Sequence, residues 1–432
     1  MKQETESTVG LIENRYLQHK KVESKEEKEK KMRSGVWKTW GKRVAVGMLG
    51  LAVMGASSLS LTGCGSEAEA ANGVPTVTIW GSGGQEVREA MQAIADAYNA
   101  DPEYSKKAKV EIQFVVSGTS EQSLPDRLAA AYKAGEKDTD FDLIALDDSA
   151  IASIEAQTSE DFFEPIDTSK IPNYENLIYK DNIVGDNFIP YRGTAVYLAY
   201  NSETVSNPPK TADELYQWIQ DNPGRFAYCD PSTGNSGFSF VANTIYNQLP
   251  EEAATSDDET WKTEHQTEWD QAFNLLETLH QNLYQTAGKV QYPMKNAGSL
   301  DLLATKEIDM TPAFVNMVLS QKSMGTLPES IQLTQLEEPF LGGLAGFMIP
   351  SIGKDKEAAL SVIDYFLSYE AQAIDWNTMF ASPVVDSTKL ENLEHEDWLK
   401  QTNMDSLRYF SIGTLQQDIA QRWTEEIGSL AK

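Results

Sequence analysis

Two adjacent carboxylates, Asp147 and Asp148, follow a short apolar segment at residues 141–146. Paired carboxylates can hold an amine or another cation through charge-assisted hydrogen bonds. The alternative is that they cap the next helix, because acidic side chains accept hydrogen bonds from the N–H groups that begin a helix. Both interpretations require a strand that ends at this pair.

A polar turn at residues 230–237 is a second candidate site. It supplies hydroxyl groups, a flexible glycine and backbone N–H groups just before an expected helix, which together can hold an anionic or polar ligand group. The turn could instead serve only to cap that helix. The candidate ligand-binding residues here are Asp230, Ser232, Thr233, Gly234, Asn235 and Ser236.

The turn at residues 80–84 offers similar chemistry together with an aromatic wall. Its candidate residues are Trp80, Ser82, Gly83 and Gly84. A buried tryptophan beside a structural glycine turn is the alternative interpretation.

The sequence singles out no catalytic centre. His265, His280 and His395 are not spaced as metal ligands, and there is no Gly-x-Ser-x-Gly, phosphate-binding loop or Cys/His cluster. A carboxylate pair of the glycosidase type stays open, because the chain has many acidic residues. We therefore expect a protein that is not an enzyme and that needs no cofactor and no metal.

Alternating strand and helix patterns must position these residues. Strand patterns lie at 76–80, 110–116 and 141–146, and helix patterns between them at 87–98 and 124–132. This order predicts a mainly parallel sheet covered by helices.

The order restarts after Asn201. A capping box at 211–214 opens a helix, a strand is expected at 226–229, and amphipathic helices follow at 238–249, 269–283 and 359–367. Two α/β lobes are therefore expected. All three polar clusters fall at the C-terminal ends of expected strands, and open parallel sheets bind their ligands beyond such ends.

The segment before the fold carries an export signal. An apolar run from Val44 to Leu61 follows a basic stretch and ends in Leu-Thr-Gly-Cys, which resembles a bacterial lipobox with Cys64 as the lipidated residue. A single transmembrane anchor is the alternative, although its glycines and serines make it a poor span. Cleavage and lipidation would hold the chain on the outer face of the cytoplasmic membrane.

Charge and cysteine content restrict the partners. Residues 1–63 carry 12 of the 36 Lys and Arg and 7 of the 65 Asp and Glu, which leaves a net charge of −34 on residues 64–432. Such an acidic chain is a poor partner for nucleic acid or an anionic membrane. Cys229 has no second cysteine to pair with once Cys64 carries lipid, so stability must come from a large core.

Several stretches together resemble the extracellular solute-binding proteins of bacterial ABC importers. They are the Trp-Gly-Ser-Gly-Gly turn at 80–84, Phe-Asp-Leu-Ile at 141–144, the stretch at 191–202 with Pro-Pro-Lys-Thr at 208–211, the segment at 343–350, and the helix at 358–372. The resemblance covers most of residues 64–432. It implies a two-lobed fold of the type II periplasmic-binding-protein class, with a ligand cleft between mainly parallel, helix-flanked lobes.

The resemblance also implies site residues and partners. It adds Phe314 and Asn316 as ligand-facing residues, and Tyr191 and Arg192 at a crossover, where Arg192 would pair a ligand carboxylate or phosphate or an acidic neighbour. The subgroup lies near thiamine, polyamine and iron binders, although no Tyr-Tyr pair is present. The implied partners are a small polar solute (thiamine-like, an amine, phosphate-bearing or a sugar) and a membrane permease, with the protein itself a monomer.

We expect the following organisation. Residues 1–31 are a charged extension or a misassigned start, 32–63 a signal peptide and 64–74 a tether; 75–197 with 303–343 form lobe 1, and 198–302 with 344–432 form lobe 2. Hinges are expected near 197–201 and 342–347. There are two alternative functions. One is a surface enzyme that acts on polysaccharide, and the other is a sensor or adhesion accessory with the same fold.

Overall fold

The computed structural model describes residues 73–116, 122–180, 183, 185–402 and 407–431. The predicted signal peptide, nearly all of the tether and Cys64 lie outside these residues. The first elements follow the predicted alternation: β1 (Thr76–Gly83), α2 (Gln85–Ala100), β2 (Lys109–Val116), α3 (Leu124–Lys133), β3 (Leu143–Asp147), α4 (Ala150–Glu155) and β4 (Phe163–Glu164).

The middle of the chain begins with the longest strand. Its elements are β5 (Ile189–Asn201), α5 (Ala212–Asp221), α6 (Asn235–Tyr246), α7 (Thr260–Thr263), α8 (Gln266–His280), β6 (Gln285–Thr286), β7 (Lys289–Val290), α9 (Lys295–Ala304), β8 (Met310–Phe314), α10 (Val315–Ser323) and β9 (Ile331–Thr334). The helix start at Thr211 is confirmed, because its hydroxyl accepts a hydrogen bond from the Glu214 N–H at 3.2 Å, while the Glu214 carboxylate accepts the N–H of Lys210 at 2.8 Å in place of the Thr211 N–H of a full capping box. The strand expected at 226–229 is not formed, and Phe226 makes only an isolated bridge to Met310.

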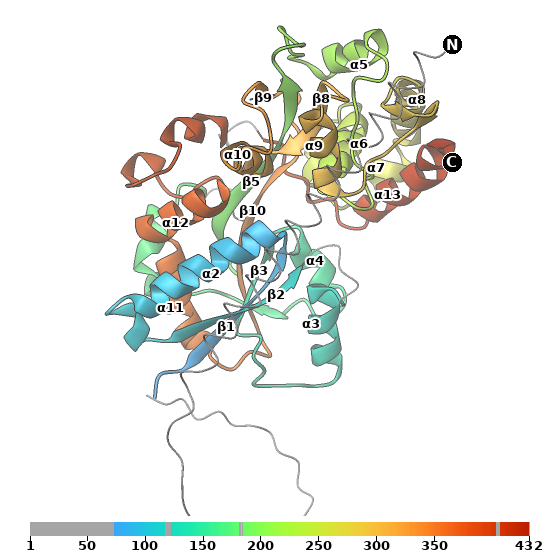
Figure 1. Cartoon of the computed structure of the whole chain (residues 1–432). Coiled ribbons are helices and arrows are strands. Elements are labelled where there is room, and N and C mark those ends of the chain that lie inside the picture. The colour runs from blue at the N-terminus through green and yellow to red at the C-terminus, as the bar shows by residue number, and fades with distance from the viewer. Residues whose placement is uncertain (1–72, 117–121, 181–182, 184, 403–406, 432) are drawn as a thin grey trace, which may run out of the picture. The chain divides into compact units, whose positions relative to one another are not determined.

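The last part of the chain returns to the first strands. Its elements are β10 (Gly342–Pro350), α11 (Lys356–Phe366), α12 (Tyr369–Met379) and α13 (Leu415–Glu426). In Figure 1, α2 and α11 lie close to β1 and β2, while α3 and α4 lie at the opposite side of this sheet.

One mixed sheet connects the two halves. Its order is β2-β1-β3-β10-β5-β8, with β4 on β10 and β9 on β5. β1 runs parallel to β2 and β3, as predicted, whereas β10, β5, β8 and β9 pair only in antiparallel fashion. The expected parallel sheet is thus correct for the first lobe and wrong for the second. The reason is that β5 and β10 are long connecting strands that run in opposite directions.

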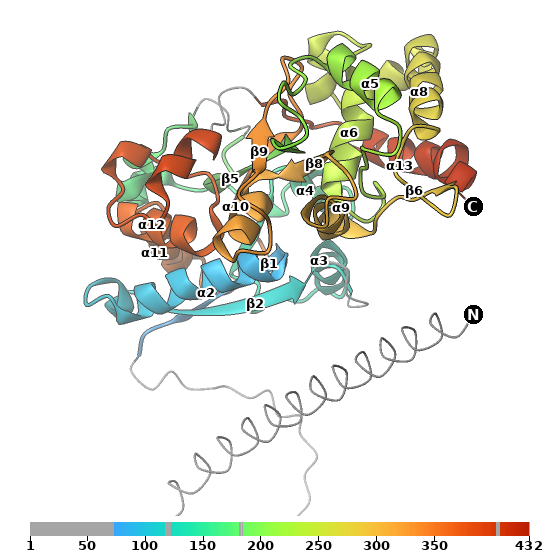
Figure 2. The ribbon, with the colours of Figure 1, turned by 45° about the horizontal axis from the view of Figure 1, so that its top comes forward.

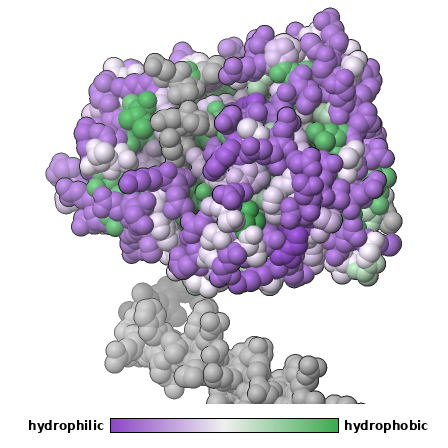
Figure 3. Space-filling view, turned by 90° about the horizontal axis from the view of Figure 1, so that it is seen from above, coloured by the Kyte–Doolittle hydropathy of each residue, from purple (hydrophilic) through white to green (hydrophobic). Residues whose placement is uncertain are grey.

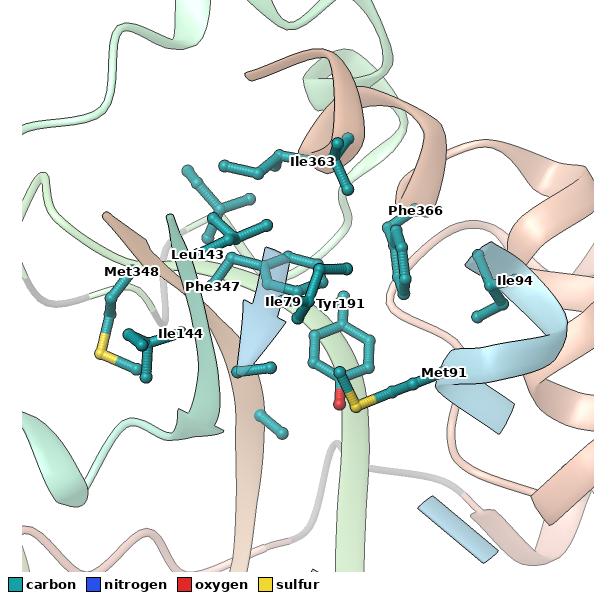
Figure 4. Packing of buried hydrophobic residues seen from close by; sticks show 14 of the residues in the cluster. Ile79, Met91, Ile94, Leu143, Ile144, Tyr191, Phe347, Met348, Ile363 and Phe366 are labelled. Atoms are coloured by element: carbon teal, nitrogen blue, oxygen red, sulfur yellow. The ribbon is translucent and has the colours of Figure 1, made fainter. Parts of the chain in front are cut away.

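Apolar side chains form two main cores, which β5 joins. Ala195 and Tyr197 belong to the core around β1, β3 and β10, whereas Val196 and Leu198 belong to the core around α6, α8 and α13, which lie together in Figure 2. In the first core, Phe347 and Tyr191 stack with ring centroids 4.7 Å apart, and Phe366 meets both rings edge-on (Figure 4). β5 therefore passes between the two cores over residues 195–198, where successive side chains point to opposite faces.

This packing differs from the lobe boundaries expected from the sequence. Segment 344–385 supplies Leu344, Ile363 and Trp376 to the first core rather than to the second. Segment 303–343 supplies Met310 and Phe340 to the second core. Segment 303–343 is divided, since its Val315 and Leu319 belong to the first core, and the apolar side chains of residues 410–427 belong to the second core as expected. Apolar periodicity identifies a buried face without showing which core buries it.

The described surface is consistent with a solvated exterior. The face in Figure 3 is largely hydrophilic, with small and separate hydrophobic groups. Within the described ranges, no helix is both long and apolar enough to cross a bilayer.

Candidate functional site

A pocket lies where the two cores meet along β5 and β10. The empty space between its lining atoms, including where it opens to solvent, is about 610 Å³. The lining residues are Asp147, Asp148, Ser149, Thr194, Asn235, Phe238, Phe314, Leu341, Gly342, Gly343, Tyr409, Phe410 and Gln416.

The two carboxylates lie at the carboxyl end of β3, as the sequence predicts. Ala345 of β10 pairs with Asp147 on one side and with Arg192 of β5 on the other. Residues directly opposite one another in a sheet point to the same face, so Asp147 and Arg192 flank a small methyl group. The Asp148 carboxylate accepts the Ser149 N–H at 2.7 Å, immediately before α4. Asp148 therefore serves the helix start as well as the pocket.

Crowding makes both carboxylates easier to protonate. Asp147 is open to solvent but lies in a concave region dense in protein atoms, and this loss of hydration raises its pKa, while Arg192 opposes the rise. Desolvation, followed by repulsion from Asp147, raises the pKa of Asp148 to about 6. Among the described residues that line the pocket there is no Lys, Arg or His. The pocket is thus an acidic site without a basic side chain in its wall.

Behind this wall, Arg192 is buried among groups of opposite charge. Its Nε donates to the Tyr191 hydroxyl at 3.1 Å, and the guanidinium interacts electrostatically with Asp147 and with Asp375 of α12. Burial lowers the pKa of Arg192, but these groups raise it by more. Asp375 is 3% exposed, and its burial raises its pKa to about 7 against the opposing effect of Arg192.

Aromatic rings form the other side of the pocket. Phe238 comes from the first turn of α6, and Phe314 stands at the end of β8, where it pairs with Val196 of β5. Tyr409 and Phe410 come from the segment before α13, and the Phe410 ring packs on Tyr246 with centroids 5.0 Å apart. Rings from three separate chain segments therefore line the same pocket as Asp147 and Asp148.

Gly342 and Gly343 begin β10 and form part of the pocket wall. A Cβ atom on Gly343 would meet no heavy atom within 4 Å. Gly343 pairs with Thr194 of β5, which also lines the pocket. The absent side chain at Gly343 therefore leaves part of the pocket open.

The polar turn before α6 is largely satisfied by the protein itself. The Asp230 carboxylate accepts the N–H and hydroxyl of Ser232, the Thr233 hydroxyl accepts the Lys295 N–H, and Asn296 of α9 accepts both the N–H and the hydroxyl of Ser236. Only Asn235 of this turn lines the pocket. These bonds favour a structural role for most of the turn.

Gly237 sets how closely α6 approaches the segment that contains Cys229. A Cβ atom on Gly237 would lie 1.8 Å from the Cys229 carbonyl oxygen. We expect Gly237→Ala to lower the free energy of unfolding by about 1–3 kcal/mol or more, because the helix must shift. Urea unfolding measures this effect. Gly343→Ala, which meets open space, is the matched control, and equal losses in the two variants would contradict the explanation.

The turn at 80–84 lies away from the pocket-lining residues. The Trp80 indole donates to the Asp140 carbonyl at 3.1 Å and packs on Phe141, and the Arg127 guanidinium lies over its ring. Ser82 and Gly83 end β1, and Gly84 precedes α2. These contacts are those of a structural tryptophan and a strand–helix turn.

Four of the sixteen predicted ligand-binding residues therefore line the pocket: Asp147, Asp148, Asn235 and Phe314. Tyr191 and Arg192 lie behind it, and Asn316 is buried in the first turn of α10. The predictions missed Ser149, Thr194, Phe238, Leu341, Gly342, Gly343, Tyr409, Phe410 and Gln416. The Gly-Gly pair at the start of a strand was the one local signal that could have indicated part of this set.

A metal centre finds no support in the described part of the chain, where no three His, Cys, Asp or Glu side chains gather closely enough to hold an ion. His280, outside the pocket, shares a hydrogen bond of 2.8 Å with the Tyr292 hydroxyl. This contact gives His280 a structural partner within the protein.

Comparison with known proteins identifies the class. The family model of bacterial extracellular solute-binding proteins matches residues 93–404, so the chain belongs to this family. The family predicted from the sequence is thereby confirmed. No curated protein sequence matches the chain.

Solved structures show the same fold at low identity. A candidate extracellular solute-binding protein from Bordetella parapertussis superposes with a TM-score of 0.61 at 12% identity, covering 82% of this chain and 98% of that one. An ABC transporter protein from Clostridium perfringens gives 0.57 at 16% identity, covering 82% and 100%. A periplasmic thiamin-binding protein gives 0.58 at 14% identity, covering 85% and 99%. The predicted type II periplasmic-binding-protein fold is confirmed.

Proposed function

We propose that the protein captures a small polar solute in the pocket between its two cores and delivers it to a membrane ABC permease. The observation that carries this proposal is the pocket itself. It is lined by residues of both cores and by both long connecting strands, β5 and β10. A solute held there would touch both lobes. It would therefore bind the closed form more tightly than the open form and stabilise it.

Hinge bending at the connecting strands is the motion that this function needs. β5 passes between the two cores over residues 195–198, and β10 begins at Gly342, beside the pocket. A few residues in such crossings can absorb the backbone rotation of a closing cleft. The driving force is the difference in affinity between open and closed forms, without any bond being made or broken.

A ligand screen tests this proposal directly. A solute present at a hundred times its Kd stabilises the folded state by about 2.7 kcal/mol, which raises the melting temperature. The screen should include amines, sugars, carboxylates and phosphates, with each mixture analysed afterwards for covalent products. Turnover of a glycan or an ester in place of reversible stabilisation would favour a surface enzyme.

Membrane attachment through Cys64 is a further part of the proposal. We expect wild-type protein expressed in a bacterium to fractionate with membranes, and Cys64→Ser to lose the lipid and remain in the soluble or uncleaved fraction. Membrane fractionation and intact-mass measurement check this. Cys229→Ser is the control, since Cys229 is buried. A wild-type protein that fractionates with membranes but whose intact mass shows neither cleavage before Cys64 nor an attached lipid would indicate a transmembrane anchor.

A further inference from the structure

We propose that the solute is a small organic cation, whose charged group meets Asp147 and Asp148 and whose apolar part lies against the aromatic wall. This inference rests on the proposed function, because it names the chemistry of the molecule that the pocket takes. Its support is the presence of two carboxylates without a basic side chain among the described lining residues, together with the aromatic side chains of the pocket.

The charge balance is negative. Asp147 and Asp148 both line the pocket, and Arg192, whose guanidinium interacts with Asp147, also interacts with Asp375. Arg192 is itself 8% exposed and does not line the pocket. The two pocket carboxylates therefore lack an equivalent positive partner in the described wall, and a bound cation would supply it.

The wall opposite the carboxylates suits a cation with an apolar body. Phe238, Phe314, Tyr409 and Phe410 line the pocket from three segments, and aromatic faces attract cations most strongly where water is excluded. Burial of the solute's methylene or ring carbons against these side chains adds hydrophobic stabilisation. An inorganic cation would use only the carboxylates and leave this wall without a function.

Anions and neutral sugars fit less well. An anion would face both carboxylates at close range without a basic residue in the wall to offset the repulsion. A sugar needs several donors as well as acceptors, and the lining donors are the side chains of Ser149, Thr194, Asn235, Tyr409 and Gln416.

The test compares charged and neutral probes in phosphate buffer, which keeps competing amines out. Putrescine, choline and thiamine are the cations; the neutral carbon isostere of choline, in which tert-butyl replaces trimethylammonium, is the matched control for shape. Glucose, maltose and citrate complete the panel. We expect at least one cation to raise the melting temperature, and the neutral isostere and citrate to have no effect.

Variants then test whether Asp147 and Asp148 bind the charged group of the solute. Asp147→Asn and Asp148→Asn should each weaken binding of the stabilising cation about tenfold or more, since each removes one carboxylate charge. Asp301→Asn changes an exposed residue of α9 that does not line the pocket. It makes the same change in net charge and should leave the affinity unchanged. Titration calorimetry measures all three, and circular dichroism checks that each variant is folded.

The outcomes separate this inference from the function on which it rests. If a sugar or an anion binds reversibly and no cation does, the cation assignment is overturned while solute binding stands. If a cation binds equally well to wild type and to both Asp variants, the assignment of its charge to this pair is overturned. If no probe binds and a covalent product accumulates from any of them, both the inference and the proposed function fail.

Discussion

Replacement of Gly343 by leucine is expected to abolish most solute binding while leaving the empty protein folded. A Cβ atom at this position meets nothing within 4 Å, and Gly343 lines the pocket, so the new side chain must extend into the space that the solute needs. Gly343 does not have a positive φ, so a side chain at this position causes no backbone strain. Its place in the strand β10 also accommodates a branched side chain.

The expected size of the effect follows from overpacking. Forcing a ligand against additional methylene groups costs about 1–3 kcal/mol, which corresponds to about a 5- to 150-fold rise in Kd. The free energy of unfolding without ligand should stay within about 0.5 kcal/mol of wild type. Calorimetry with the solute identified by the screen, together with urea unfolding, checks both values.

A size series makes this result specific. Gly343→Ala should have a small effect and Gly343→Leu a large one, because only the longer side chain reaches across the pocket. Ser232→Ala, in the polar turn outside the pocket, should bind normally. Normal binding by Gly343→Leu together with lost binding by Ser232→Ala would move the site to that turn.

Replacement of Arg192 by methionine is expected to give the largest loss of stability among these variants. It leaves Asp375 buried without its compensating charge, and the Asp375 Oδ1 atom already has no hydrogen-bond partner in the described structure. Removing one partner of a buried charged pair costs about 3–5 kcal/mol. Urea unfolding at neutral pH and above measures this loss.

The loss should depend on pH with a defined sign. The pKa of Asp375 in the folded protein is raised to about 7 from an ordinary 3.8, so its contribution to stability is fully present below pH 3.8 and is lost as pH rises through about 7. Without Arg192 this pKa rises further. Arg192→Met should therefore be destabilising mainly above pH 7 and much less so at pH 5, where Asp375 is protonated.

A double variant provides the control. Arg192→Met combined with Asp375→Leu removes both buried charges, and such replacements are often neutral or stabilising. Recovery of stability at pH 8 in the double variant supports the charge explanation. An equal loss for Arg192→Met at pH 5 and pH 8, without recovery, would show that Arg192 acts through packing alone.

Local patterns predicted the elements and part of the site. Alternating and helical spacing identified β1, α2, β2, α3 and β3 in order, and the apolar segment that ends at Asp147 placed the acidic pair correctly at a strand end. The family followed from motifs spread along the chain and is confirmed. These features depend on residues close together in the sequence, which is why they could be predicted.

Other predictions failed where long-range packing decides which residues become neighbours. Ser236 was expected to offer free groups to a ligand, but Asn296, sixty residues later, accepts its hydrogen bonds. Segment 344–385 was expected in the second lobe, yet β10 returns its apolar face to the first core. Neither partner is visible in a local pattern, because the pattern records burial without naming the neighbour.

The amino-acid sequence by itself determined the class of protein, the strand–helix order of the first lobe, the acidic pair and the candidate lipid-attachment cysteine, because each is encoded in short-range spacing and residue type. Only the tertiary structure decided that Tyr409 and Phe410 face Asp147 across one pocket, and that Arg192 lies behind it with Asp375. The physical reason is that a binding pocket is formed by long-range packing, which brings together side chains more than two hundred residues apart.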